Sequence, residues 1–203
     1  NGTATGTTIV DGSFGKARAF NGTSDYLRIA NQVTSPNSSF TWEAWIFLNQ
    51  LPTSPNNYSV INQGGDPGIG GVSPGLGLNY TGQVYFYLYE GGSSEGVDYK
   101  SLLSYAALSV SRWYHVAGVY TTQRMKIYVD GVLDRDTAYS GGSQNLNNFY
   151  VGANAAYIGL GGDYQFFNGI IDEVRASNIA RSPSEFNLQL PPVNLTPTPS
   201  GTT

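Results

Sequence analysis

Hydrophobic and polar residues alternate along much of this chain, in short runs that Gly, Pro, Asn and Ser separate. Because successive side chains of a strand point to opposite faces of a sheet, a period of two predicts β-strands. No stretch of the sequence sustains a helical period. Strands are expected at residues 16–20, 26–30, 39–48, 58–63, 78–80, 83–90, 97–104, 113–120, 125–129, 148–154 and 169–177.

The segments between these runs carry turn signals. Asp130-Gly131 is typical of a two-residue type I′ hairpin turn, in which both residues adopt positive φ. Residues 64–77 are rich in Gly and Pro and are expected to form a long loop. Residues 182–186 predict a single turn of helix, with Ser182 as its cap. The chain therefore has the pattern of an all-β protein with many tight turns.

Residues 83–89 predict a strand with two different faces. One face is plain hydrocarbon and is expected to point into the core: Val84, Phe86 and Leu88. The opposite face carries three tyrosines in a row: Tyr85, Tyr87 and Tyr89. A core needs only one face of a strand, so the tyrosine face is a candidate functional surface.

Composition excludes several classes of function. The 203 residues suffice for one large β domain or two small ones, and a hydrophobic share of 40% can supply a core. The net charge of −4 leaves no basic patch to neutralise phosphates, which argues against a nucleic-acid partner. No apolar run approaches the roughly 20 residues that a membrane helix needs, so no membrane insertion is expected. The absence of Cys removes thiol catalysis and thiolate metal sites.

Asn-x-Ser/Thr sequons recur along the chain, without Pro in the middle position. Together they favour a secreted, glycosylated protein, since such sequons are the acceptors of N-linked glycans. The candidate glycosylation sites are Asn1, Asn21, Asn37, Asn57, Asn79 and Asn194.

Four stretches, in their order and spacing, resemble the laminin-G-like domains of the concanavalin-A-like lectin/glucanase superfamily. They are "GKARAFNGTSDYLRI" (15–29), "FTWEAWIFL" (40–48), "RWYHVAGVYTTQRMKIYVDGVL" (112–133) and "FNGIIDEVRASNIARSPSEF" (167–186). The resemblance implies an all-β, concanavalin-A-like jelly-roll sandwich of two curved antiparallel sheets. The resemblance covers about residues 6–188, and a domain is expected over residues 1–190. The composition of residues 191–203 predicts a Pro/Thr-rich tail or linker.

Glycoside hydrolases of this superfamily use paired carboxylates at alternate positions of one strand. No predicted strand carries that pattern, since Glu43 stands alone and Asp134 and Asp136 flank an arginine just after a hairpin. The only histidine, His115, lies in the middle of a predicted strand and is interpreted as structural. The chain is therefore expected not to be an enzyme.

The resemblance also implies a structural Ca²⁺ between the N-terminal turn and the last strand. The matching positions are Asn21, Asp25 and Asp172. Oxygen ligands from carboxylates and carbonyls suit Ca²⁺. The alternative is that Asp25 is a turn residue and that Asp172 pairs with Arg175 or Arg28.

If the tyrosine face belongs to the concave sheet, it forms an aromatic platform for sugar rings, because Tyr offers an apolar body and a polar tip. Polar contacts at the rim are expected from Asp66, Asn154 and Asp163. Two alternatives remain open: a neighbouring subunit covers the tyrosines, or they reflect only the preference of Tyr for strands. The expected function is a lectin-like extracellular module that binds a glycan or glycoprotein.

A second hypothesis is a structural subunit of an extracellular filament or surface assembly. Related modules carry an extra first strand, which is expected to be missing here, and an unpaired sheet edge is a template for another chain. In this hypothesis copies polymerise by exchange of a terminal strand or tail. The candidate segments are residues 7–10 and 191–203.

Overall fold

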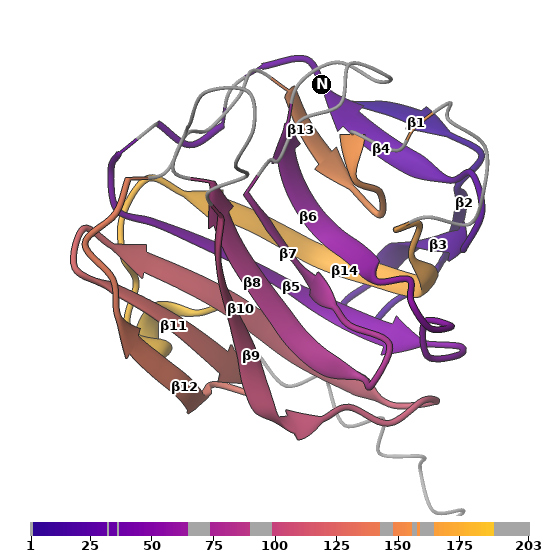
Figure 1. Ribbon diagram of the computed structural model, residues 1–203. Helices are drawn as coiled ribbons and strands as arrows, with labels where there is room; N and C mark the ends of the chain where they lie inside the picture. Colours follow the sequence, from indigo (N-terminus) through magenta and orange to yellow (C-terminus); the bar gives the residue numbers. More distant parts are fainter. Residues whose placement is uncertain are drawn as a thin grey trace, which may run out of the picture.

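The structure is a computed structural model in which two antiparallel sheets pack face to face (Figure 1). It describes residues 2–31, 33–35, 37–64, 74–89, 99–142, 148–155, 158 and 165–188. Each sheet has seven strands, and all the registered strand pairs are antiparallel. No described helix is long and apolar enough to cross a membrane.

The first sheet, sheet A, carries the tyrosine strand near one edge. Its order is β1-β4-β13-β6-β7-β8-β9. The strands are β1 (Thr3–Thr5), β4 (Tyr26–Ile29), β13 (Asn148–Val151), β6 (Tyr58–Gly64), β7 (Gly75–Leu78), β8 (Gln83–Tyr89) and β9 (Tyr99–Ala107).

The second sheet, sheet B, contains the strand that carries Trp42 and Trp45 and the last described strand of the chain. Its order is β12-β11-β10-β5-β14-β3-β2. The strands are β12 (Val132–Ala138), β11 (Arg124–Val129), β10 (Trp113–Thr121), β5 (Phe40–Leu48), β14 (Asn168–Ser177), β3 (Lys16–Asn21) and β2 (Thr8–Asp11).

The core lies between the two sheets and follows the period of two. In β5, Phe40 and Trp42 are fully buried in the main cluster, while the alternate residues Thr41 and Glu43 point to the outer face of sheet B. Across the core, Phe86 of β8 meets Phe40 edge to face at 6.1 Å. Burial of these large rings is the main source of stability, because each removes a large apolar area from water.

The structure corrects the predicted loop over residues 64–77. Gly75 and Gly77 belong to β7, which pairs with β6 and β8. A Cβ on Gly75 would lie 2.3 Å from the Tyr87 hydroxyl, and one on Gly77 would lie 2.0 Å from the Tyr58 carbonyl oxygen. These glycines therefore serve close packing within a strand rather than chain reversal.

The N-terminal segment also differs from expectation. Of residues 7–10, expected to fill a neighbour's gap, 8–10 pair with β3 of the same domain, and Thr3–Thr5 pairs with β4. The N-terminal strands thus occupy one edge of each sheet and pair within their own domain. Strand exchange between copies stays a prediction. The tail 191–203 lies outside the described residues.

Both local turn predictions are confirmed. Asp130 and Gly131 have φ values of 49° and 76°, as a type I′ turn requires. Pro183–Glu185 forms a short 3₁₀ helix, and the Glu185 carboxylate accepts a hydrogen bond of 2.9 Å from the Ser182 N–H. These sequence signals are local, so they need no tertiary information.

Candidate functional site

The tyrosine strand has the faces that the sequence predicts. Val84, Phe86 and Leu88 are fully buried between the sheets. The rings of Tyr85 and Tyr87 therefore lie on the outer face of sheet A, where they stack with centroids 4.8 Å apart and an interplanar angle of 26°. The side chain of Tyr89 lies outside the described part of the chain.

Tyr87 is held by a buried amide network beneath the surface. The register places it in one row with Gly75 and Asn62 of the neighbouring strands. Its hydroxyl accepts a hydrogen bond of 3.2 Å from Asn154 Nδ2, which also donates to Gln165 Oε1 at 2.8 Å. Because only 8% of Tyr87 is exposed, the expectation of an accessible ring does not hold for this residue.

Asn154 has a different role from the rim contact that the sequence analysis predicted. It is buried and positions the Tyr87 hydroxyl, so it supports the platform from below rather than meeting a ligand at the rim. The other two predicted rim residues, Asp66 and Asp163, lie outside the described residues. Tyr85, which is half-buried, is the ring of the stacked pair that faces outward.

Beside Tyr85, the edge strand β9 adds exposed side chains that the sequence reading missed. Leu103 lies opposite Tyr85 in the register and is exposed. Tyr105 is 73% exposed, and the guanidinium of Arg135 lies 4.1 Å from its ring centroid. Asp134 accepts the Tyr105 N–H at 2.5 Å, which fixes the strand edge. These side chains could have been found in the sequence from the alternation of residues 103 and 105, which are exposed, with residues 102 and 104, which are buried.

The other half of the outer face is covered. Tyr150 of β13 is fully buried in a small cluster with Ala153, Ala155 and Phe166, which pack over it. Arg28 of β4 donates from Nε to the Tyr150 hydroxyl at 3.2 Å. Among the described residues of the β7–β9 half, β7 is buried, Tyr85 of β8 is half-buried, and the exposed side chains lie on β9.

The predicted calcium ligands are not brought together. Asp172 accepts the N–H groups of Phe14, at 2.9 Å, and Glu173, at 2.8 Å, and so anchors the β2–β3 turn. Asn21 lies opposite Asn168, four residues away along β14, a separation of about 13 Å.

Asp25, the third predicted ligand, serves the turn that begins at Asn21. Its carboxylate accepts the Asn21 N–H at 3.1 Å and the Ser24 hydroxyl at 3.4 Å. No group of three or more His, Cys, Asp or Glu side chains that could hold a metal occurs among the described residues. The set Asn21, Asp25 and Asp172 therefore does not fit Ca²⁺, which takes six to eight oxygen ligands. Calcium binding by the chain stays a prediction.

Several predicted glycosylation sites are turn residues. The Oδ1 atom of Asn21 accepts the N–H groups of Thr23 and Ser24, and that of Asn79 accepts the N–H groups of Thr81 and Gln83. Asn37 is exposed and Asn57 is half-buried. Asn1 and Asn194 lie outside the described residues. Occupancy of the sites stays a prediction.

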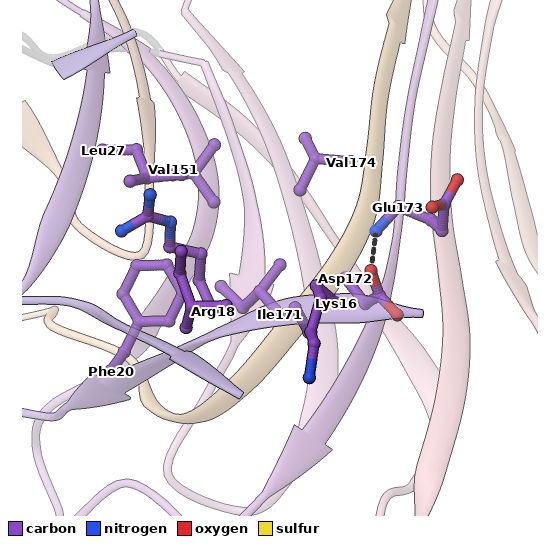
Figure 2. Close-up of a pocket in the computed structure, with 11 residues that line it drawn as sticks. Lys16, Arg18, Phe20, Leu27, Val151, Ile171, Asp172, Glu173 and Val174 are labelled. Carbon is purple, nitrogen blue, oxygen red and sulfur yellow. Dashed lines mark hydrogen bonds between the residues drawn. The ribbon is translucent and has the colours of Figure 1, made fainter. Parts of the chain in front are cut away.

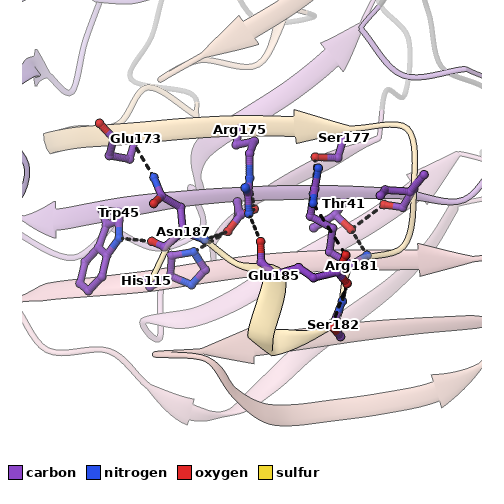
Figure 3. Close-up of polar contacts among 12 residues, drawn as sticks. Thr41, Trp45, His115, Glu173, Arg175, Ser177, Arg181, Ser182, Glu185 and Asn187 are labelled. Atoms are coloured by element: carbon purple, nitrogen blue, oxygen red, sulfur yellow. Dashed lines mark hydrogen bonds and ion pairs between the residues drawn. The ribbon is translucent and has the colours of Figure 1, made fainter. Parts of the chain in front are cut away.

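A buried ionic cluster on the outer face of sheet B contains Glu43 and His115. Figure 3 shows His115 together with Arg175 and Asn187, which also bind Glu43. Glu43 is fully buried, accepts a hydrogen bond from His115 Nε2 at 2.8 Å and forms an ion pair with Arg175. The segment after β14 closes over the cluster: the Asn187 N–H donates to Glu43 at 3.0 Å, and the Phe186 ring lies 5.6 Å from His115.

Electrostatics indicate that Glu43 is ionised. Burial alone raises the pKa of this carboxyl, but hydrogen bonds from His115, the Asn187 N–H and Arg175, together with the charge of Arg175, hold the pKa below its ordinary value. Arg175 therefore pairs with Glu43 and not with Asp172. The Glu43–His115 pair is buried and fastens the C-terminal segment to sheet B, which supports the structural interpretation of His115.

A cavity of about 300 Å³, the flank cavity, is lined by β2, β3 and β14 of sheet B and by β4 and β13 of sheet A (Figure 2). Phe20, Leu27 and Val151 form its apolar end, and Lys16 and Asp172 lie at the other. Its volume is at the lower limit of small-molecule pockets.

The two packed antiparallel sheets define a β-sandwich. A family model, Laminin_G_3, described as the concanavalin A-like lectin/glucanases superfamily, matches residues 21–187. The chain belongs to this family, and its fold is a concanavalin A-like jelly-roll sandwich. No curated protein matches the sequence.

Solved structures with this fold include several binding domains. Domain 4 of AbnA, an extracellular GH43 arabinanase from Geobacillus stearothermophilus, solved with arabinotriose, aligns with a TM-score of 0.63 and 19% identity over 90% of this chain and 84% of its own. The binding domain of Paraclostridial Mosquitocidal Protein 1 aligns with a TM-score of 0.65 and 15% identity, over 91% of this chain and 45% of its own. A putative carbohydrate binding protein from Bacteroides ovatus aligns with a TM-score of 0.58 and 23% identity, over 85% of this chain and 46% of its own.

These likenesses establish the fold, not the ligand. The chain spans most of the arabinanase domain but less than half of the other two structures. The activities of those whole proteins therefore carry over only as proposals.

Proposed function

We propose that this protein is a non-catalytic, extracellular lectin-like module that binds glycans or glycoproteins in adhesion to a surface or matrix. The observation that carries the proposal is the stacked pair of Tyr85 and Tyr87 on the open half of sheet A. Tyr85 offers a ring, and Tyr87 fixes that ring in place from below through its own anchored hydroxyl.

Such a surface suits a sugar ring. The C–H face of a pyranose or furanose packs on an aromatic face, and the rim of the ring needs hydrogen-bonding groups. A fixed aromatic side chain loses little conformational freedom on binding. Leu103 and the Tyr105–Arg135 pair extend the surface along β9, so a chain of several sugar units matches it better than one unit.

A non-catalytic role is supported by what the open surface contains. The strands that form it and the adjoining β6 have no Asp or Glu within Tyr58–Gly64, Gly75–Leu78, Gln83–Tyr89 and Tyr99–Ala107. Glycoside hydrolysis needs two carboxyl groups beside the bond that breaks. Glu43, a buried carboxylate, is committed to His115 and Arg175. The arabinanase domain solved with arabinotriose and the other binding domains of this fold agree with a binding role.

Calorimetric titration with arabinotriose and with oligosaccharides selected on a glycan array tests the proposal. Tyr85→Ala should weaken binding by about 1–3 kcal/mol, the scale of one stacked aromatic contact. Because Tyr85 is partly exposed, the melting temperature of the Tyr85→Ala variant should differ little from that of the wild type. Tyr80→Ala, which removes an exposed ring in the β7–β8 turn, is the matched control and should bind as the wild type does. Unchanged affinity of Tyr85→Ala would refute the platform.

The alternative function is a structural subunit of an extracellular filament or assembly. It is favoured by the unpaired edge of β2, where Ile9 is 65% exposed beside the flank cavity. An unpaired edge next to an apolar hollow suits a strand-like segment of another copy. Electron microscopy of the chain at high concentration separates the two: filaments favour assembly, and monomers favour the isolated module.

A further inference from the structure

A second hollow, of about 100 Å³, lies at one end of the sandwich. There β3 ends at Asn21, β14 begins at Asn168 and β6 begins at Tyr58, and the loop after β5 adds Thr53 and Asn56. The Tyr58 ring packs on Phe167 in the core between the sheets, so the hollow does not belong to the outer face that carries Tyr85.

The lining of the hollow is polar and uncharged. It has side-chain amides, from Asn21, Gln50, Asn56 and Asn168, and hydroxyls, from Thr23, Thr53 and Tyr58. Amides and hydroxyls both donate and accept hydrogen bonds. The lining therefore matches a ligand that also does both.

The walls of the hollow are fixed by hydrogen bonds within the protein. Asn21 Oδ1 accepts the Thr23 N–H at 2.9 Å and holds the turn. Gln50 Nε2 donates to the Tyr58 hydroxyl at 3.3 Å, and Asn49 Nδ2 donates to Asn168 Oδ1 at 3.2 Å. The Asn56 N–H donates to the Thr53 carbonyl at 2.8 Å. The lining is thus set in place before any ligand arrives.

Other polar groups of the lining are unused. Within the part of the chain that the structure describes, no hydrogen bond is made by the hydroxyls of Thr23 and Thr53 or by the side-chain amide of Asn56. The buried carboxylate of Asp25, which accepts the Asn21 N–H, lies directly behind the turn and disfavours an anion. The free groups are therefore suited to a neutral partner.

We propose that this hollow is a second binding site, which takes one edge of a neutral sugar unit. Hydroxyl groups of a sugar would meet Thr53, Asn56 and the adjoining amides. The hollow, at about 100 Å³, is smaller than a pocket that encloses a small molecule, so only part of one sugar unit enters it. The site shares no residue with the Tyr85 platform, so it can be tested independently of the proposed function.

Two-dimensional ¹H–¹⁵N NMR on the intact chain, produced without N-glycans, tests this site. The probes are galactose, glucose, N-acetylglucosamine and arabinose, each at millimolar concentration, with glucuronate as the charged comparison. We expect at least one neutral sugar to shift the side-chain amide signals of Asn56 and Asn168, and glucuronate not to shift them. The same shifts should persist in Tyr85→Ala, because the platform is not involved.

Thr53→Ala combined with Asn56→Ala should weaken this binding at least tenfold while the backbone spectrum elsewhere is preserved. Thr122→Ala is the matched control, since it removes an exposed hydroxyl from the turn between β10 and β11, beyond the opposite end of β5. The proposal is overturned if no neutral sugar moves the amide signals, if glucuronate moves them equally, or if the double variant binds as the wild type does. Loss of the shifts in Tyr85→Ala would also overturn it.

Discussion

At the scale of single residues, Glu43 shows how one buried charge organises a surface. Its carboxylate accepts hydrogen bonds from His115, Arg175 and the Asn187 N–H. The pKa of this carboxyl lies below the ordinary value of 4.5. A carboxyl with a lowered folded pKa contributes stability above its unfolded pKa, and this contribution is lost as the pH falls through the folded pKa. We therefore expect the free energy of unfolding to fall below about pH 4.5, partly through Glu43.

Glu43→Gln tests this contribution. At pH 7 it should destabilise the fold by about 3 kcal/mol, because the partly buried Arg175 loses its counter-charge. Its stability should also depend less on pH below 4.5 than that of the wild type, as urea unfolding at several pH values would reveal. Asp11→Asn removes an exposed ion pair with Lys16 and should hardly change the unfolding curve at pH 7. Equal acid sensitivity of Glu43→Gln and wild type would contradict the role of Glu43.

At the scale of elements, β7 supports the platform because it has glycine where its neighbours have side chains. A Cβ at position 75 would lie 2.3 Å from the Tyr87 hydroxyl, so Gly75→Ala must displace that ring. We expect a loss of about 1–3 kcal/mol in stability, as for other overpacked sites, together with weaker glycan binding. Thermal melts and calorimetric titration measure the two effects. A variant with unchanged melting and binding would contradict the packing of Tyr87 on β7.

Strand by strand, most of sheets A and B is predictable from the sequence, since alternation is local and the core needs one face of each strand. The strand Gly75–Leu78 is not, because glycine has the same appearance in a loop and in a tightly packed strand. The candidate site was predicted in part: the face of Tyr85 follows from alternation, but the burial of Tyr87 depends on Asn154 from a distant segment. The separation of Asn21 from Asp172 was not predictable, because sequence does not reveal register along β14.

At the scale of the whole molecule, all the described strands lie between residues 3 and 177, and the C-terminal segment is fastened to sheet B as far as Leu188. We therefore expect a chain without residues 191–203 to keep the melting temperature of the intact protein. If the tail mediates assembly, light scattering should show weaker association of the shortened chain. A large drop in melting temperature would contradict the predicted boundary between the domain at 1–190 and its tail.

The most direct test of glycan binding on sheet A is a crystal structure of the chain with the best oligosaccharide from an array. We expect a sugar ring stacked on Tyr85, with further units following β9 past Leu103 toward Tyr105. An oligosaccharide bound only elsewhere, with Tyr85 making no contact to it, would contradict the proposed function.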